Sequence, residues 1–162
     1  MIEKEKYHQR IDVNKMIETA ARFHQNEIFQ FFVDISLKNH SDVKEIYQIA
    51  INDCAISNNM SLLIKSLEVG VDVNFSDYSN RTPLLNAARV DNYEIMNLLV
   101  NHPEINLNIT STGNTNILDW AITVEDEEAV DLIMKLDEKK FNKNRENKET
   151  TSVQLAISRG NP

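Results

Sequence analysis

The chain has 162 residues, of which 41% are hydrophobic and 26% charged, a composition that supports one domain with a sizeable core and argues against intrinsic disorder. Its 25 acidic and 17 basic residues give a formal net charge of -8, which repels phosphate backbones and disfavours a nucleic-acid partner. The amino terminus, MIEKEKYHQR, is charged from its first residues, so neither a signal peptide nor a membrane span is expected there.

Apolar side chains recur along the chain at helical spacing, and polar or glycine-containing breaks divide them into pairs of short helices. In chain order the expected helices are 14–25 and 27–37, 45–57 and 60–69, 82–90 and 93–101, and 115–123 and 126–136. Gly70 directly follows the apolar run of the second pair, where a left-handed residue that ends a helix is cheapest for glycine. The chain therefore predicts an all-α protein of helix-turn-helix units.

The third pair carries the clearest local signals. The Thr82 hydroxyl can cap its first helix, and Pro83 at the first helical position loses no hydrogen bond. Ala87 and Ala88 are small enough to let two helices approach closely. Asn80 stands in the preceding turn and tolerates a positive φ better than most residues other than glycine.

This pattern recurs with a period of about 33 residues. Ala55 precedes Ala88 by one period, Ala20-Ala21 precede Ala87-Ala88 by about two, and Thr115 and Ala121 follow Thr82 and Ala88 by one. Each unit can bury its apolar face only by stacking on its neighbours. The same alignment places Cys54 and Trp120 at the position of Ala87, so both are expected in the core, with the fourth pair splayed or repacked to hold the indole.

These units resemble the ankyrin repeat family, and the best match runs from Asp77 to Val100. It contains Thr82-Pro83-Leu84, Ala87-Ala88, Glu94-Ile95 and Leu98-Leu99. The resemblance implies an all-α solenoid with short β-hairpin-like loops, in one domain with units near 13–40, 46–76, 77–109 and 110–142 and a partial fifth at 143–162. The segment 151–162 resembles a first helix without its partner, so the chain is expected to be a piece of a longer protein or to end in a frayed helix.

Residues with catalytic or metal-binding chemistry are scattered. The four histidines have no metal-ligand spacing, and the three glycines form no phosphate-binding loop. The acidic run 125–128 is expected to begin a helix, where negative charge is favourable. A basic segment, 139–148, is either a solvated loop or a patch for phosphate or an acidic partner. No enzyme activity, cofactor or metal is therefore expected.

The resemblance implies a protein-protein interaction module that binds its partner on the concave side. The expected contact residues are Tyr78, Ser79, Arg81, Arg89 and Val90 in the third unit, Ser111, Thr112, Asn114, Ile122 and Thr123 in the fourth, Ile56 and Ser57 in the second, and Arg22 and Phe23 in the first. Phe23 and Ile122 are expected to be exposed.

Three of these residues, Tyr78, Arg81 and Arg89, are expected to contribute most to binding without belonging to the core, and the two arginines to favour an acidic segment.

The chain is further expected to be a monomer inside the cell, in the cytoplasm. The alternative is the recognition domain of a larger enzyme, such as a bacterial effector secreted into a host cytoplasm, whose catalytic domain lies outside these residues.

Overall fold

A computed structural model describes residues 12–39, 42–123, 125 and 127–135, and within them all regular secondary structure is helical. The helices form four consecutive pairs. The pairs are α1 (Val13–Arg22) with α2 (Asn26–Lys38), α3 (Val43–Ser57) with α4 (Met60–Glu68), α5 (Pro83–Arg89) with α6 (Tyr93–Val100), and α7 (Ile117–Thr123) with α8 (Glu127–Met134). Every helix end lies within three residues of its expected position. The expected all-α architecture is confirmed.

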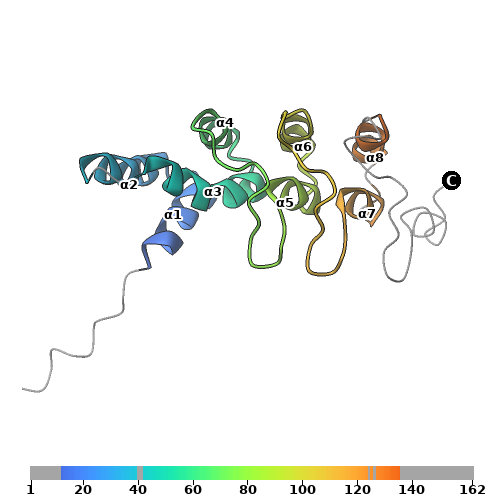
Figure 1. The fold of residues 1–162 in the computed structure, drawn as a ribbon, viewed down its shortest axis with the longest axis horizontal. Helices are drawn as coiled ribbons and strands as arrows, with labels where there is room; N and C mark the ends of the chain where they lie inside the picture. The colour runs from blue at the N-terminus through green and yellow to red at the C-terminus, as the bar shows by residue number, and fades with distance from the viewer. Residues whose placement is uncertain (1–11, 40–41, 124, 126, 136–162) are drawn as a thin grey trace, which may run out of the picture.

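The first helices of the pairs pack in series, α1 on α3, α3 on α5 and α5 on α7, and form an inner row. Figure 1 shows α4, α6 and α8 as a second row on one side of it, while the loops that enter α5 and α7 project as two long hairpins from the other. Each of these outer helices packs on the inner helix of its own pair. The inner helices and the hairpins together form one side of the stack.

Small side chains allow the inner helices to approach one another. Ala21, Cys54, Ala55, Ala87 and Ala121 are completely buried. The outer helices close the core with larger apolar side chains, all of them fully buried: Leu63 of α4, Ile95 and Leu99 of α6, and Ile133 of α8. The expected core position of Cys54 is confirmed, and burial raises the pKa of its thiol, which therefore stays protonated.

A residue in the left-handed conformation joins the two helices of every pair. These residues are His24, Asn58, Asp91 and Glu125, with φ of 55°, 58°, 57° and 58°. Asn92, directly after Asp91, donates its backbone N–H to the Ala87 carbonyl over 2.9 Å, and its side chain accepts from the Ile95 N–H over 3.3 Å. The turn and the cap of the next helix are thus made by adjacent polar residues.

The fourth unit follows the third at 34 residues rather than 33, and this corrects the sequence alignment. Asn80 and Asn114 are the left-handed residues of the two hairpins, with φ of 54° and 58°. Thr82 caps α5, whereas the cap of α7 is Asn116, which accepts from the Asp119 N–H over 2.8 Å. The longer exit segment after α6 supplies the additional residue.

This register changes the positions of three side chains in the fourth unit. Trp120 aligns with Asn86 rather than Ala87, and it is half-buried against the core. Ala121 takes the fully buried alanine position, and Ala129 aligns with Ile95 without an additional residue between them. The expected insertion of the indole into the alanine column was therefore wrong.

Asparagine side chains hold the two hairpins side by side. The Asn74 side chain donates to the Glu104 carbonyl over 2.9 Å and accepts from the Asn106 N–H over 2.8 Å. Nearer the tips, Asn80 donates to the Thr110 carbonyl over 2.5 Å. These hydrogen bonds fix the position of each hairpin relative to the hairpin of the next unit.

Two expectations lie outside the described residues, the partial fifth unit at 143–162 and the basic segment 139–148. Among the helices that the structure describes, none combines the length and the apolar character needed to cross a bilayer.

Candidate functional site

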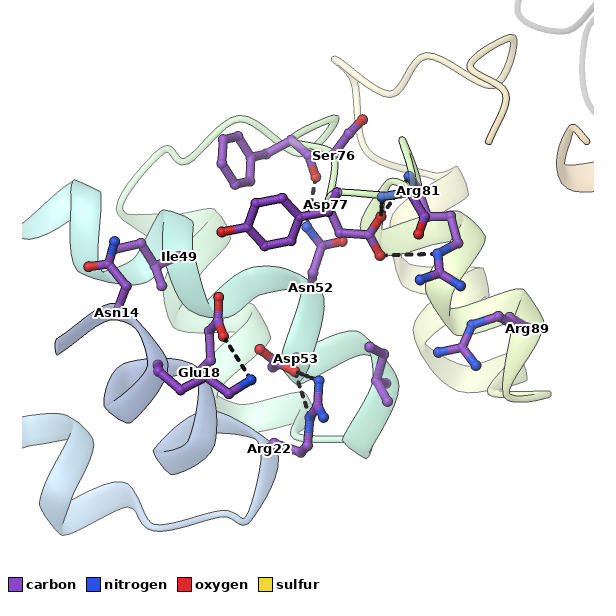
Figure 2. Close-up of a pocket in the computed structure, with 15 residues that line it drawn as sticks. Asn14, Glu18, Arg22, Ile49, Asn52, Asp53, Ser76, Asp77, Arg81 and Arg89 are labelled. Carbon is purple, nitrogen blue, oxygen red and sulfur yellow. Dashed lines mark hydrogen bonds and ion pairs between the residues drawn. The ribbon is translucent and has the colours of Figure 1, made fainter. Parts of the chain in front are cut away.

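A groove of about 530 Å³ lies between the inner helices α1, α3 and α5 and the hairpin at residues 75–81. Figure 2 shows Glu18 and Arg22 on the α1 side of it, Asn52 and Asp53 on α3, and Arg89 on α5. Residues of three consecutive units thus line one groove.

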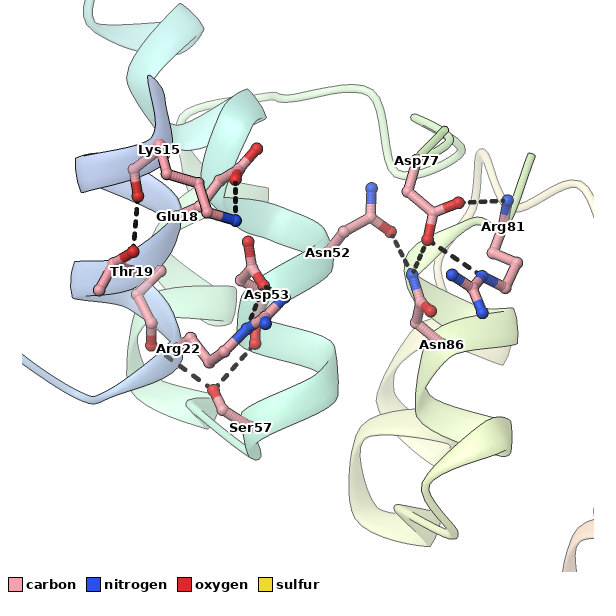
Figure 3. A network of polar contacts seen from close by, with 11 residues as sticks. Lys15, Glu18, Thr19, Arg22, Asn52, Asp53, Ser57, Asp77, Arg81 and Asn86 are labelled. Carbon is pink, nitrogen blue, oxygen red and sulfur yellow. Dashed lines mark hydrogen bonds and ion pairs between the residues drawn. The ribbon is translucent and has the colours of Figure 1, made fainter. Parts of the chain in front are cut away.

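A buried amide network forms the wall of the groove between α3 and α5. Asn86 is completely buried, and its side-chain nitrogen donates to Asn52 Oδ1 over 3.0 Å and to Asp77 Oδ2 over 3.2 Å. Asn52 in turn donates to the Phe75 carbonyl over 2.9 Å. Figure 3 shows how the Asn86 amide connects Asn52 of α3 to Asp77 of the hairpin, and these contacts together hold the hairpin in a defined position.

Asp77 organises the hairpin from within. Its carboxylate accepts from the backbone N–H groups of Ser79, over 2.8 Å, and Arg81, over 3.0 Å, and from Arg81 Nε over 3.1 Å. Burial alone would raise the pKa of Asp77, but these hydrogen bonds, the one from Asn86 and the nearby Arg81 charge outweigh burial and lower the pKa. Asp77 therefore remains ionised and keeps Arg81 in place.

The opposite end of the groove has its own ion pairs. Arg22 Nε donates to Asp53 Oδ1 over 2.7 Å, and Arg22 Nη2 also contacts this oxygen. Lys15 Nζ lies 3.5 Å from Glu18 Oε2. The Asp53 side chain is largely buried in α3. Because Arg22 belongs to α1, this ion pair joins the first unit to the second.

Arg89 differs from the other cations of the groove. It forms no ion pair with any described residue, and its Nε is shielded from solvent without a hydrogen-bond acceptor. Figure 2 shows its guanidinium apart from the Asp77 and Asp53 carboxylates.

The structure brings six of the sequence-predicted contact residues together in this groove. They are Arg22, Ile56, Tyr78, Ser79, Arg81 and Arg89. The Tyr78 side chain is fully exposed, and Phe75 beside it is 42% exposed. Arg81 and Arg89 are half-buried rather than free on the surface, and Arg81 is already bound to Asp77.

The remaining predicted residues lie around the groove. The Thr112 N–H donates to the Ser79 carbonyl over 2.9 Å, which places the tip of the second hairpin, with Ser111 and Asn114, beside the first. Val90, Thr123 and Ser57 are half-buried at the ends of their helices, and Phe23 is 66% exposed as expected. Ile122 is only 5% exposed, because it takes the position of Ala88, so its expected exposure was wrong.

Sequence reasoning missed polar residues that shape the groove and its wall, namely the buried Asn52, Asp53 and Asn86 and the half-buried Asp77. For Asn52, Asp53 and Asn86 the signal was present as polar side chains inside the apolar helical stretches AINDCAI and LLNAA. Within the described residues, no three histidine, cysteine or carboxylate side chains are grouped so that they could hold a metal ion. The groove is lined by hydrogen-bonding, charged and aromatic side chains.

Comparison with protein-family models gives one match, to the family described as ankyrin repeats (3 copies), at residues 17–111 and again at residues 51–147. No curated protein matches the chain.

Proposed function

Because this chain belongs to the ankyrin repeat family, whose members are in general protein-protein interaction modules, we propose that it binds a segment of a partner protein in the groove between α1, α3, α5 and the 75–81 hairpin. The observation that carries this proposal is the fully exposed Tyr78 beside the half-exposed Phe75, both lining the groove. Aromatic side chains and arginine are enriched at the centre of protein interfaces.

Rigidity supports the same assignment. Asp77, Asn86 and Asn52 hold the hairpin against α3 and α5 before any partner arrives. Binding to a preorganised site loses less conformational entropy than binding to a loop that must first become ordered. A volume of about 530 Å³ accommodates a few side chains of an extended segment or loop.

The rest of the partner extends along the row of hairpins in this proposal. Ser111, Thr112 and Asn114 continue the surface beyond Ser79, and Thr123, Val90 and Phe23 border it. Ile122 is omitted because it is buried. We place the whole interaction on one domain, since each inner helix packs directly on the next from α1 to α7.

The test uses Tyr78→Ala, with Lys65→Ala as a matched control on the exposed surface of the outer helix α4. Proteins captured from native lysate by the unmodified chain are identified and purified, and their affinities for both variants are measured. Tyr78→Ala is expected to weaken binding about thirtyfold, as for truncation of a buried aromatic anchor, and Lys65→Ala to leave it unchanged. Melting temperatures should stay the same, because neither side chain is in the core. Retained affinity in Tyr78→Ala, with loss upon changes to α4 or to the 139–148 segment, would contradict the proposal.

A further inference from the structure

The cations of the groove differ in whether a carboxylate already neutralises them. Arg22 is bound to Asp53, Arg81 to Asp77 over 3.1 Å, and Lys15 to Glu18 over 3.5 Å. An arginine that is held in this way has part of its hydrogen-bonding capacity occupied and its charge compensated. These three side chains shape the groove more than they attract a ligand.

Arg89 is the exception among the described groove residues. It lines the groove from the end of α5, and no carboxylate of the described chain lies within ion-pair distance of it. Its Nε is shielded from water without an acceptor, so the guanidinium is partly desolvated before a ligand binds. Partial desolvation makes an arriving carboxylate a stronger partner than it is for an arginine fully in water.

Local charge points the same way. The four cations Lys15, Arg22, Arg81 and Arg89 face the three carboxylates Glu18, Asp53 and Asp77, which leaves the groove at +1 whereas the whole chain is at -8. Screening limits the reach of the distant negative charges to about 8 Å at physiological ionic strength. An acidic side chain is therefore repelled by most of this protein's surface and attracted at this groove.

On the basis of the proposed function, we propose that Arg89 is the specificity residue of the groove and that it binds an aspartate or glutamate side chain of the partner segment. A planar guanidinium donates two parallel hydrogen bonds to a carboxylate, which an amide of the same shape cannot match. Ile56, Phe75 and Tyr78 line the same groove and provide apolar contact for a neighbouring side chain. The recognised segment thus combines a carboxylate with an adjacent aromatic or aliphatic residue.

This assignment is tested by phage display, in which a library of random peptides is selected for binding to the immobilised full chain. Peptides selected by the unmodified protein should be enriched in Asp or Glu next to an aromatic or aliphatic residue, and their recovery should fall for Tyr78→Ala. Peptides selected by Arg89→Glu should instead carry Lys or Arg at the charged position. This reversal depends on the charge at residue 89 and would not follow from a merely structural role.

Binding of one selected peptide and its Glu→Gln version then measures the contact. The unmodified chain should bind the Gln version about tenfold more weakly, which corresponds to about 1.4 kcal/mol. Arg89→Gln should bind the two peptides equally, and Arg89→Lys should retain part of the difference. Arg81→Gln is the matched control and should keep the full discrimination, because Arg81 is already bound to Asp77.

The outcomes separate this inference from the function on which it rests. If peptides require Tyr78 but Arg89→Gln still distinguishes Glu from Gln, or if discrimination is lost in Arg81→Gln instead, the assignment of Arg89 is wrong and the groove remains the binding site. If no selected peptide requires Tyr78, the proposed function fails and this inference fails with it.

Discussion

Asp77 connects the stability of the hairpin with the shape of the groove. One carboxylate accepts two backbone N–H groups, the Arg81 side chain and the Asn86 amide. Hydrogen bonds to an ionised group are about twice as strong as neutral ones, so this residue contributes more than its position in a loop suggests. The substitution of Asp77 should therefore affect both folding and binding.

Asp77→Asn is expected to make the free energy of unfolding less dependent on pH in the acidic range. Because the folded-state pKa of Asp77 lies below its ordinary value of about 3.9, the stabilisation is complete above that value and is lost as pH falls through the folded-state pKa. The unmodified chain should be more stable than Asp77→Asn at neutral pH, and the gap should close below about pH 4. Urea midpoints of both proteins across this range measure it. A gap that stays constant or widens in acid would show that the charge of Asp77 is not the cause.

Single side chains of the site were only partly predictable from the sequence. Tyr78 was expected to be exposed and is, because a hairpin tip offers nothing to bury it. Arg81 was expected to be a main contact for an acidic partner segment, but the Asp77 side chain accepts hydrogen bonds from the Arg81 backbone N–H and from its guanidinium. This contact becomes visible only once the turn geometry is known. Asn86 could be recognised as polar within an apolar helix, but its partners Asn52 and Asp77 belong to other elements.

At the scale of the elements, helix existence and type followed from apolar periodicity and capping residues, and both were predicted correctly. The alignment of the fourth unit with the third was harder to predict from the sequence. The segment between α6 and α7 is one residue longer than its counterpart, and the sequence alone did not show where the additional residue is absorbed. Capping by Asn116 and the left-handed Asn114 locate it before α7, and this shift accounts for both Trp120 and Ile122.

Two glycines in loops provide a matched test of turn geometry. Gly70 has a φ of +79°, and a Cβ there would meet no atom within 4 Å, so Gly70→Ala should destabilise the fold only through backbone strain, by about 1 kcal/mol. Gly113 lies outside the left-handed region, and a Cβ there would be 3.5 Å from Thr115 Oγ1, an ordinary contact. Gly113→Ala should therefore be neutral or slightly stabilising. Denaturant unfolding measures the free energy of unfolding of both variants, and an equal decrease in the two would contradict this account.

At the scale of the whole molecule, the stack is linear, so each unit depends on its immediate neighbours. The unit of α5 and α6 has neighbours on both sides, and α5 buries six of its seven residues. The first unit packs mainly on α3, and among the described residues α2 leaves large apolar side chains exposed, Phe31 at 59% and Leu37 at 58%. Stability should accordingly be lower at the amino-terminal end of the described stack than in the unit of α5 and α6.

Two large-to-small substitutions test whether opening proceeds from that end. Phe29 of α2 is buried, with its ring 5.2 Å from the ring of Tyr47 in an edge arrangement, and Leu99 of α6 is fully buried in the centre. Each change to alanine removes core contacts worth about 2–5 kcal/mol. Phe29→Ala should speed amide hydrogen exchange in α1 and α2 while leaving α5 and α6 near their original protection, because the end unit can open without the rest.

Leu99→Ala should speed exchange in every helix that packs directly or indirectly on α6, since opening the central unit exposes both of its interfaces. Exchange followed by mass spectrometry resolves these segments. If Phe29→Ala lowers protection equally in α5 and α6, the described stack unfolds in a single step and local opening of the first unit is not a separate process.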